Sequence, residues 1–441
     1  MGWLRNTLLL TLLAAIVAMP FSAKWCQGAL IIYTICWIAE GQWGRKIDML
    51  WHNPIIVFYL VFLALHVIGI SYSEDASNGW FNVEKKIFLF LLPVVFGTTW
   101  SIDRKSLQFL FKGFIASCFI ATLCCLAMAF VHFQAADPQN NFDHSTLALF
   151  RQLNHGDGGW WMHFSYIELA SGIGMHPTFL SLYLIFCILL ILHLYKESIP
   201  SFSPIKKVGI ILLLLYFEII IVLLSSRIII LSLIIIIISA VVNQHEMKRM
   251  PAMRRMLMAA TGIIPLLLIL WINPISKYRS IQEPAVSETY SPSPDGVYEY
   301  STGIRKSLWQ LSIHSIQVEN PVIGAGTGDV KIVMKKHGDE TGSYNIIGSY
   351  DPHNQFLYTQ LGLGIAGLIA LGACFYFPAW LAFRQKNFFY LAFMLTITFT
   401  CFTESMLESQ RGIIFFGIFN SLLIFPYYNL YAASQQRIVY G

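Results

Sequence analysis

A histidine at the start of an apolar segment is the residue of this chain best suited to acid–base chemistry. His353 lies where a long polar segment meets a new apolar run. Its imidazole, with an ordinary pKa of about 6.5, can take a proton near neutral pH, and Asp351 or Asn354 could orient it. If the chain is helical from 353 onward, Gly364 and Gly367 lie within about 40° of His353 around the helix axis. We therefore predict a helix headed by His353, whose same face is cleared by glycine for close helix packing.

Two arginines are suited to an anionic substrate. Arg227 directly precedes a long, almost wholly apolar run, and Arg305 lies in a segment whose apolar residues recur at helical spacing. A guanidinium group is planar and binds phosphate through two parallel hydrogen bonds. Simpler roles also fit, because Arg227 could be an interfacial anchor, Arg305 a solvated helix residue and His353 a capping residue.

Further polar residues complete the set of candidates. Arg411 precedes the last apolar run and Asn354 follows the histidine, so we include both as candidate substrate-binding residues. The weaker candidates are Glu168, His176, Glu218, Glu404 and Glu408.

The composition identifies the setting of these residues. Hydrophobic residues make up 56% of the 441 and charged residues only 12%, against about 25% charged residues in an average soluble domain. Apolar runs long enough to cross about 30 Å of hydrocarbon recur along the whole chain. The sequence therefore predicts an all-α polytopic membrane protein with about twelve transmembrane helices and a large outer loop.

The predicted spans are divided by polar connections. A helix over the whole apolar stretch 207–242 would be about 54 Å long, so Ser225-Ser226-Arg227 is predicted to divide it into two.

Arg5 before the first run suits a signal peptide, but no small-x-small cleavage site follows, so we interpret that run as a retained span. The runs centre within 6–21, 26–39, 54–71, 85–99, 107–132, 172–194, 208–224, 228–243, 256–273, 353–377, 387–402 and 412–430.

Lysine and arginine residues of the short loops predict the orientation. With a cytoplasmic N-terminus, most basic loop residues face the cytoplasm, and both termini lie there. These residues are Arg45, Lys46, Arg104, Lys105, Lys196, Lys206, Lys207, Lys248, Arg249, Arg254, Arg255, Arg384 and Lys386. Arg227, Arg305, His353 and Arg411 then fall together on the outer face.

This topology divides the chain into three parts. Residues 1–273 hold nine spans and an outer loop at 133–171, residues 274–352 form the large outer loop with an amphipathic helix, and residues 353–441 hold three spans and a cytoplasmic C-terminus. Within the large loop, 302–318 places Leu308 and Leu311 on one apolar stripe, which predicts the helix. The stretch 324–329, Gly-Ala-Gly-Thr-Gly-Asp, lacks the spacing of a dinucleotide-binding loop, so we expect a flexible turn near the membrane surface.

Several functions are disfavoured by what the chain contains. The cytoplasmic loops are short and have no Walker-type glycine-rich loop, which argues against chemistry driven by ATP or a nucleotide sugar. The eight cysteines lie in or beside apolar runs, so neither a disulfide framework nor a thiolate metal site is expected. The net charge of +5 belongs mostly to orientation signals, so nucleic acid is not an expected partner.

The histidine motif resembles the signature of a known family. His353-Asn354, nine residues, Gly364, two residues and Gly367 look like the His-[Asn/Ser/Gln]-x9-Gly-x2-[Gly/Thr/Tyr] element of the O-antigen ligase family. The spacing of this element is fairly specific.

The arginines follow the same family's order of features. Arg227 and Leu231 are similar to its Arg-x3-Leu element. In that family a large periplasmic loop carries a second essential arginine, and Arg305 stands at the similar position here. The resemblance covers roughly residues 160–430.

The resemblance implies a GT-C-like glycosyltransferase of the inner membrane of a Gram-negative bacterium. Such ligases move a glycan from undecaprenyl diphosphate to a sugar hydroxyl of lipid A-core on the periplasmic face, in lipopolysaccharide biosynthesis, with inversion at the anomeric carbon. On this hypothesis Arg227 and Arg305 stabilise the departing diphosphate, and His353 acts on the acceptor hydroxyl as general base or orienting group. The chain lacks an Asp-x-Asp motif, so we expect no metal and no cofactor.

Other functions stay open at this stage. O-antigen polymerases and protein O-oligosaccharyltransferases of the same superfamily would use the same donor with another acceptor. A transporter of the lipid-linked glycan would also need many spans. Transporters, however, bind substrate near the middle of the membrane on broken helices, whereas the polar residues here gather on one face.

Overall fold

The computed structural model describes residues 2–99, 102–136, 163–195, 202–243, 264, 301–341 and 351–440. Within these ranges the chain is helical and has no strand, so the all-α prediction is confirmed for them. The chain forms two compact units. The first contains residues 1–19, 23–110 and 291–441, and the second contains 20–22 and 111–290.

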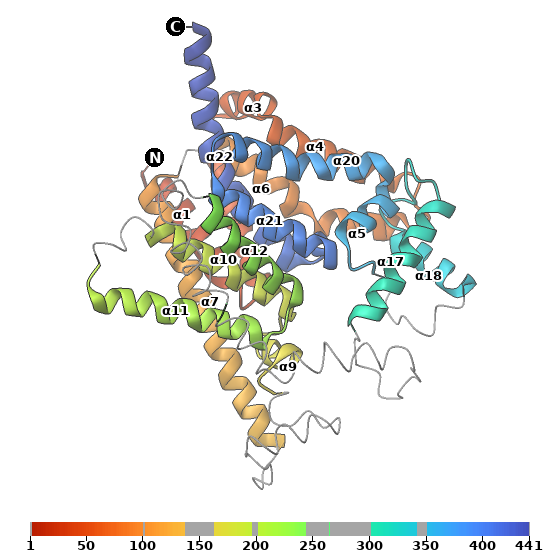
Figure 1. Ribbon diagram of the computed structural model, residues 1–441. Coiled ribbons are helices and arrows are strands. Elements are labelled where there is room, and N and C mark those ends of the chain that lie inside the picture. Colours follow the sequence, from red (N-terminus) through yellow and green to blue (C-terminus); the bar gives the residue numbers. More distant parts are fainter. Residues whose placement is uncertain are drawn as a thin grey trace. The chain divides into compact units, whose positions relative to one another are not determined.

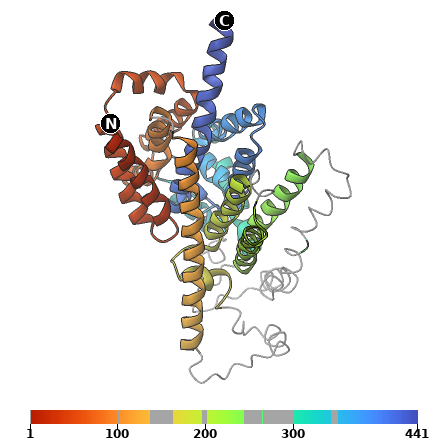
Figure 2. The same ribbon diagram turned by 90° about the vertical axis from the view of Figure 1, so that its left-hand side faces the viewer.

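The first unit joins segments from both ends of the sequence. Its N-terminal helices are α1 (Gly2–Ala18), α2 (Ala23–Ala39), α3 (Trp43–His52), α4 (Pro54–Ile70), α5 (Ala76–Lys85) and α6 (Ile87–Thr98). Its C-terminal helices are α17 (Ser301–Val318), α18 (Val330–Glu340), α20 (Gln355–Arg384), α21 (Phe388–Thr403), the 3₁₀ turn η4 (Met406–Glu408) and α22 (Gln410–Tyr440). α4 lies along α20 and α6 along α22 (Figure 1), while α1 lies along α2 (Figure 2). The core of this unit is therefore built from helices distant in sequence.

The second unit contains five helices in its described part. They are α7 (Arg104–Ala136), whose residues from 111 onward belong here, α9 (Tyr166–Ser171), α10 (Pro177–Tyr195), α11 (Pro204–Leu223) and α12 (Arg227–Asn243). α10 packs against α11 and α12 and is buried over most of its length. Ser225, with a φ of 51°, turns the chain between α11 and α12. The predicted division of the long apolar stretch at this turn is confirmed.

The described helices include clear candidates for membrane spans. α7, α10 and α20 are long and apolar enough to cross a membrane, and α3 with α4 makes a fourth candidate if the pair, bent by 84°, is one span. Shorter apolar segments lie in α1, α2, α12, α21 and α22. The apolar run 256–273, apart from position 264, and the loop portions 137–162, 265–300 and 342–350 lie outside the described residues. The count of twelve spans and their orientation stay predictions.

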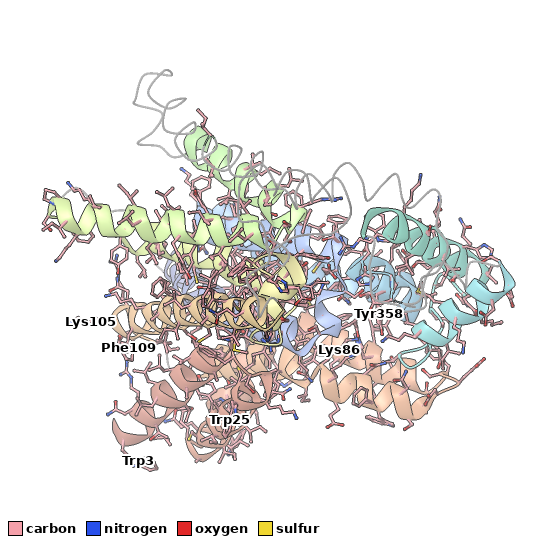
Figure 3. The ribbon with its side chains drawn as sticks, turned by 90° about the horizontal axis from the view of Figure 1, so that it is seen from below. Trp3, Trp25, Lys86, Lys105, Phe109 and Tyr358 are labelled. Atoms are coloured by element: carbon pink, nitrogen blue, oxygen red, sulfur yellow. The ribbon has the colours of Figure 1, made fainter. Side chains whose placement is uncertain are left out.

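Large apolar side chains on the outside of the first unit fit a lipid environment. Trp3 of α1 is 72% exposed and Trp25 of α2 is 78% exposed (Figure 3). Exposed aromatic residues of this kind are typical of helices whose ends lie at a membrane–water interface. The chain is accordingly a membrane protein.

The helix after His353 is broken in its middle. Gly364 has φ 63° and ψ −162°, a conformation open to glycine because it has no Cβ. A Cβ at this position would collide with the backbone carbonyl of Val322. The predicted unbroken helical face from His353 to Gly367 is therefore wrong, since the helix begins only at Gln355 and is interrupted at Gly364.

A segment of the large loop occupies the break. Near the break, backbone groups of α20 bond to the chain at 321–326 and so regain partners that the interrupted helix does not supply. The bonds run from Ala325 N to Leu361 O (2.8 Å), from Gly326 N to Gly362 O (2.9 Å) and from Ile365 N to Pro321 O (3.0 Å). The loop and the helix are thus held together by their main chains.

The glycine-rich stretch 324–329 is also fixed on its other side. Thr327 Oγ1 donates to the carbonyl of His66 at 2.6 Å, and the carboxylate of Asp329 accepts from the backbone N–H groups of Glu74 at 2.7 Å and Asp75 at 3.0 Å. The expected flexible turn is therefore wrong. The stretch is a packed connection between α20 and the segment from α4 to α5.

Candidate functional site

A tight turn holds His353 ahead of α20. The Asp351 carboxylate accepts a hydrogen bond from the backbone N–H of His353 at 2.8 Å, forming an Asx turn across Pro352. His353 has a φ of 45°, which histidine tolerates better than most residues. The side-chain oxygen of Asn354 accepts from the backbone N–H groups of Phe356 and Leu357, the second and third residues of α20, and caps the helix. Each residue of the motif therefore has a local structural task besides any chemical one.

A glutamate between α21 and α22 joins His353 to Arg305. Glu404 Oε2 lies 3.1 Å from His353 Nδ1, and Glu404 Oε1 lies 2.6 Å from Arg305 Nη2. The two partners use different oxygens of one carboxylate. The structure thus brings Arg305 and His353 together through a residue that the sequence marked only as a weaker candidate.

This cluster, defined as Arg305, Glu404 and His353 and called the Glu404 cluster below, is partly open. The Glu404 side chain is 8% exposed, while those of His353 and Arg305 are 24% and 28% exposed. Burial by itself lowers the pKa of His353, but the hydrogen bond and charge of Glu404, aided by the charge of Asp351, raise that pKa above its ordinary value. Arg305 acts in the opposite direction. The glutamate therefore favours a proton on the imidazole.

Arg305 is positioned by the packing of α17. The predicted helix 302–318 is confirmed as Ser301–Val318, and Leu308 and Leu311 of the predicted apolar stripe are buried. They belong to a hydrophobic cluster with residues of α18 and with Tyr358 and Leu361 of α20. α20, which follows His353, belongs to the same hydrophobic cluster as α17. Packing in this cluster therefore fixes both the helix that carries Arg305 and the helix that follows His353.

A second carboxylate on the same connection binds lysines. Glu408 Oε1 lies 2.6 Å from Lys86 Nζ, and Glu408 Oε2 lies 3.4 Å from Lys85 Nζ. Gln355 Nε2 donates to Glu408 at 3.4 Å, while its Oε1 accepts a backbone N–H of η4 at 2.7 Å. Lys86 Nζ also stands 5.5 Å from the ring of Tyr358, and both are labelled in Figure 3. We call Lys85, Lys86, Gln355 and Glu408 the Glu408 cluster. Its central pair is almost closed, since Lys86 is 4% and Glu408 7% exposed, while Lys85 at its edge is 18% exposed.

The remaining candidates lie elsewhere. Arg411 is half-buried in the first turn of α22, in the first unit. Arg227 belongs to the second unit, where it is the exposed first residue of α12. Glu168, His176 and Glu218 also lie in the second unit.

A comparison with known families matches part of the chain. Residues 208–372 match the sequence model of a family described as O-antigen ligase. Over these residues the chain is similar to the O-antigen ligase family. No curated protein is similar enough in sequence to count as a match. The matched stretch includes Arg227, Arg305 and the histidine motif up to Gly367, so the resemblance drawn from those motifs is confirmed.

The match to this family, together with the apolar helices, indicates a glycosyltransferase-like membrane enzyme. The matched segment ends before Glu404 and begins after Lys85 and Lys86, so the position of these three residues beside the candidate residues comes from the fold. Sequence reasoning missed Lys85 and Lys86 as members of a cluster. The signal was a pair of lysines directly before an apolar run, on the same predicted outer face as Glu404 and Glu408.

Proposed function

We propose that the protein is an O-antigen ligase that transfers a glycan from undecaprenyl diphosphate to a sugar hydroxyl of lipid A-core. The reaction takes place on the periplasmic face of the inner membrane, with both termini in the cytoplasm. The observation that carries the proposal is the link from Arg305 through Glu404 to His353. Glycan transfer from a diphosphate needs a cation for the leaving group beside a group that accepts a proton, and this cluster offers both.

Arg305 stabilises the leaving diphosphate. As the bond between the anomeric carbon and the phosphate oxygen breaks, negative charge builds up on the diphosphate, and a positioned guanidinium lowers the energy of that state. We assign the same role to Arg227 and a supporting one to Arg411. The polyprenyl chain keeps the donor in the bilayer, so its diphosphate lies at the depth of the membrane surface.

His353 receives the acceptor's proton. Its Nδ1 faces Glu404, so with a proton on Nδ1 the other ring nitrogen, Nε2, has a lone pair for the acceptor hydroxyl. The hydroxyl oxygen attacks the anomeric carbon from the side opposite the diphosphate, its proton passes to Nε2, and the configuration inverts. Glu404 orients the ring and stabilises the imidazolium, as the acidic member of a catalytic triad does.

The acceptor distinguishes the proposal from related functions. An O-antigen polymerase or a protein O-oligosaccharyltransferase would use the same diphosphate-binding and proton-accepting groups, so the site favours the donor more strongly than the acceptor. Asn354 lies next to His353 and contributes through the cap that fixes α20 and through contact with the acceptor. A transporter of the lipid-linked glycan would move its substrate without forming a new glycosidic bond, so transfer to an acceptor separates the two functions.

The test is a transfer reaction with purified protein in detergent. We would incubate it with an undecaprenyl-diphosphate glycan and, in parallel, with lipid A-core, a second lipid-linked repeat and a Ser/Thr-rich protein. We expect glycan on lipid A-core, with inverted linkage and with the same yield in the presence of a chelator. Product on another acceptor would reassign the acceptor, and no product on any acceptor would refute the transferase.

A further inference from the structure

The arginine that has to bind diphosphate is already occupied by a carboxylate. Arg305 Nη2 and Glu404 Oε1 are 2.6 Å apart, a short charge-assisted hydrogen bond. The other oxygen of the same carboxylate binds His353 at 3.1 Å. Any anion that takes the Arg305 guanidinium therefore also changes what His353 faces.

Charged side chains of both signs lie around this point in the described part of the first unit. Three cations lie on α5, on the junction of α5 with α6 and on α17, and three carboxylates lie before α20 and between α21 and α22. The cations are Lys85, Lys86 and Arg305, and the carboxylates are Asp351, Glu404 and Glu408. A diphosphate adds at least two negative charges, and like charges in contact repel each other strongly. Its charge repels the carboxylate that holds Arg305, which favours displacement of that carboxylate.

Glu404 is the carboxylate best placed to move. Its two partners are about one quarter exposed, so an incoming anion can reach them. Glu408, in contrast, is held by Lys85, Lys86 and Gln355 in nearly closed surroundings. Asp351 is held by the backbone of His353 at 2.8 Å and by the hydroxyl of Ser405.

We propose that Glu404 is an exchangeable counterion, which leaves Arg305 when the donor diphosphate binds and stays with His353. This inference rests on the proposed function and adds an order to it. His353 faces Asp351 from its own turn, Arg305 from α17 and Glu404 from the connection between α21 and α22. Once the diphosphate engages Arg305, Glu404 no longer shares its charge with that guanidinium and acts more strongly on the imidazole, so the proton acceptor reaches full strength only with the donor in place.

The variant Glu404→Gln tests the exchange, because glutamine keeps the shape of glutamate and removes its charge. With no carboxylate to displace, the purified variant should bind undecaprenyl diphosphate about three- to tenfold more tightly than the wild type. Its turnover should fall at the same time, because the imidazolium loses its counterion. Structural damage alone would not produce tighter binding of undecaprenyl diphosphate together with slower turnover.

Glu408→Gln is the matched control. It removes the same charge from the same connection without touching Arg305 or His353, and we expect its affinity for undecaprenyl diphosphate to stay within about twofold of the wild type. Equal tightening in both variants would reduce the effect to net charge and overturn the exchange. Unchanged or weaker binding by Glu404→Gln, with normal binding by the wild type, would overturn it as well. If the wild type binds no undecaprenyl diphosphate, the proposed function fails and the exchange with it.

A structure of the wild type with bound undecaprenyl diphosphate gives the same answer without a variant. We expect Arg305 Nη2 on a phosphate oxygen and more than about 4 Å from Glu404, with the contact between Glu404 and His353 retained. An intact pair of Arg305 and Glu404 beside bound diphosphate would contradict the exchange.

Discussion

Two glutamates separated by one turn of chain hold cations in very different surroundings. The Glu404 cluster connects α17, the turn before α20 and the end of α21, and its cation and imidazole are about one quarter exposed. The Glu408 cluster connects α5, α6 and α20, and Lys86 and Glu408 are 4% and 7% exposed. The open cluster can receive a substrate, whereas the closed one ties helices together.

This difference separates two uses of the same chemistry. A buried ion pair is expensive to form, and breaking it leaves an unpaired charge, so it specifies how elements meet. A half-open pair costs less to exchange for another anion, so it suits a binding site. Variants in each cluster test whether the Glu404 cluster binds substrate and the Glu408 cluster holds the helices together.

Glu408→Ala should cause the largest loss of stability. The change leaves the buried Lys86 ammonium without its partner at 2.6 Å, and removing one member of a buried pair costs about 3–5 kcal/mol. Thermal unfolding in detergent measures the effect. The double variant Lys86→Met with Glu408→Gln should recover part of the loss, and a stability of the single variant close to that of the wild type would contradict a structural role.

Arg305→Ala should affect activity more than stability. Loss of one charge-stabilising group costs about 10² to 10³ in rate, while the side chain, which is 28% exposed, should leave the fold intact when it is removed. The neighbouring Lys306 is exposed on the same helix, and Lys306→Ala provides the control. Equal rates of glycan transfer in the two variants would place the diphosphate elsewhere.

Gly364→Ala should loosen the link between the loop and α20. Alanine at φ 63° is strained, and its Cβ would collide with the backbone of Val322, so we expect about 2 kcal/mol or more of destabilisation. A Cβ added at Gly372 in the same helix would have its nearest contact, with the side chain of Tyr376, at 3.7 Å. Gly372→Ala should therefore be neutral or slightly stabilising. Similar melting temperatures for the two variants would argue against the break.

Glu404→Gln should shift the acid side of the pH–rate profile. Glu404 raises the pKa of His353, so the wild type loses its neutral imidazole, and its activity, as the pH falls through that raised pKa. Removing the negative charge lowers this pKa and moves the acid limb of kcat/KM to lower pH. Glu408→Gln should leave the limb in place. A shift of the limb to higher pH in Glu404→Gln would contradict the assigned role of Glu404.

Much of the fold could be predicted from short-range patterns. Apolar periodicity gave the α17 helix, and the Ser225–Arg227 turn was predicted because one helix through it would be too long for a single span. The break at Gly364 could not be predicted this way, because it depends on a loop from a different part of the chain whose backbone bonds replace those of the helix. The same bonds explain why the glycine-rich stretch before Val330 is packed although its composition suggests a flexible turn.

The sequence allowed us to predict which types of residue form the candidate site. It hardly allowed us to predict which of those residues contact one another. His353 and Arg305 stood out because their chemistry and their motif spacing are visible in the sequence. Glu404 and Lys86 did not, since a glutamate between two apolar runs and a lysine before one are ordinary loop residues. Their meaning depends on helices distant in sequence that meet only in the folded chain.

In the proposed mechanism His353, held by Glu404, takes the proton in a glycan transfer supported by Arg305. The most direct measurement is the initial rate of transfer from an undecaprenyl-diphosphate glycan to lipid A-core by purified His353→Ala, compared with the wild type at equal amounts of folded protein. Because a general base contributes about 10² to 10⁴ in rate, we predict a loss of that size with an unchanged melting temperature. Transfer at the wild-type rate by the folded variant would contradict the account.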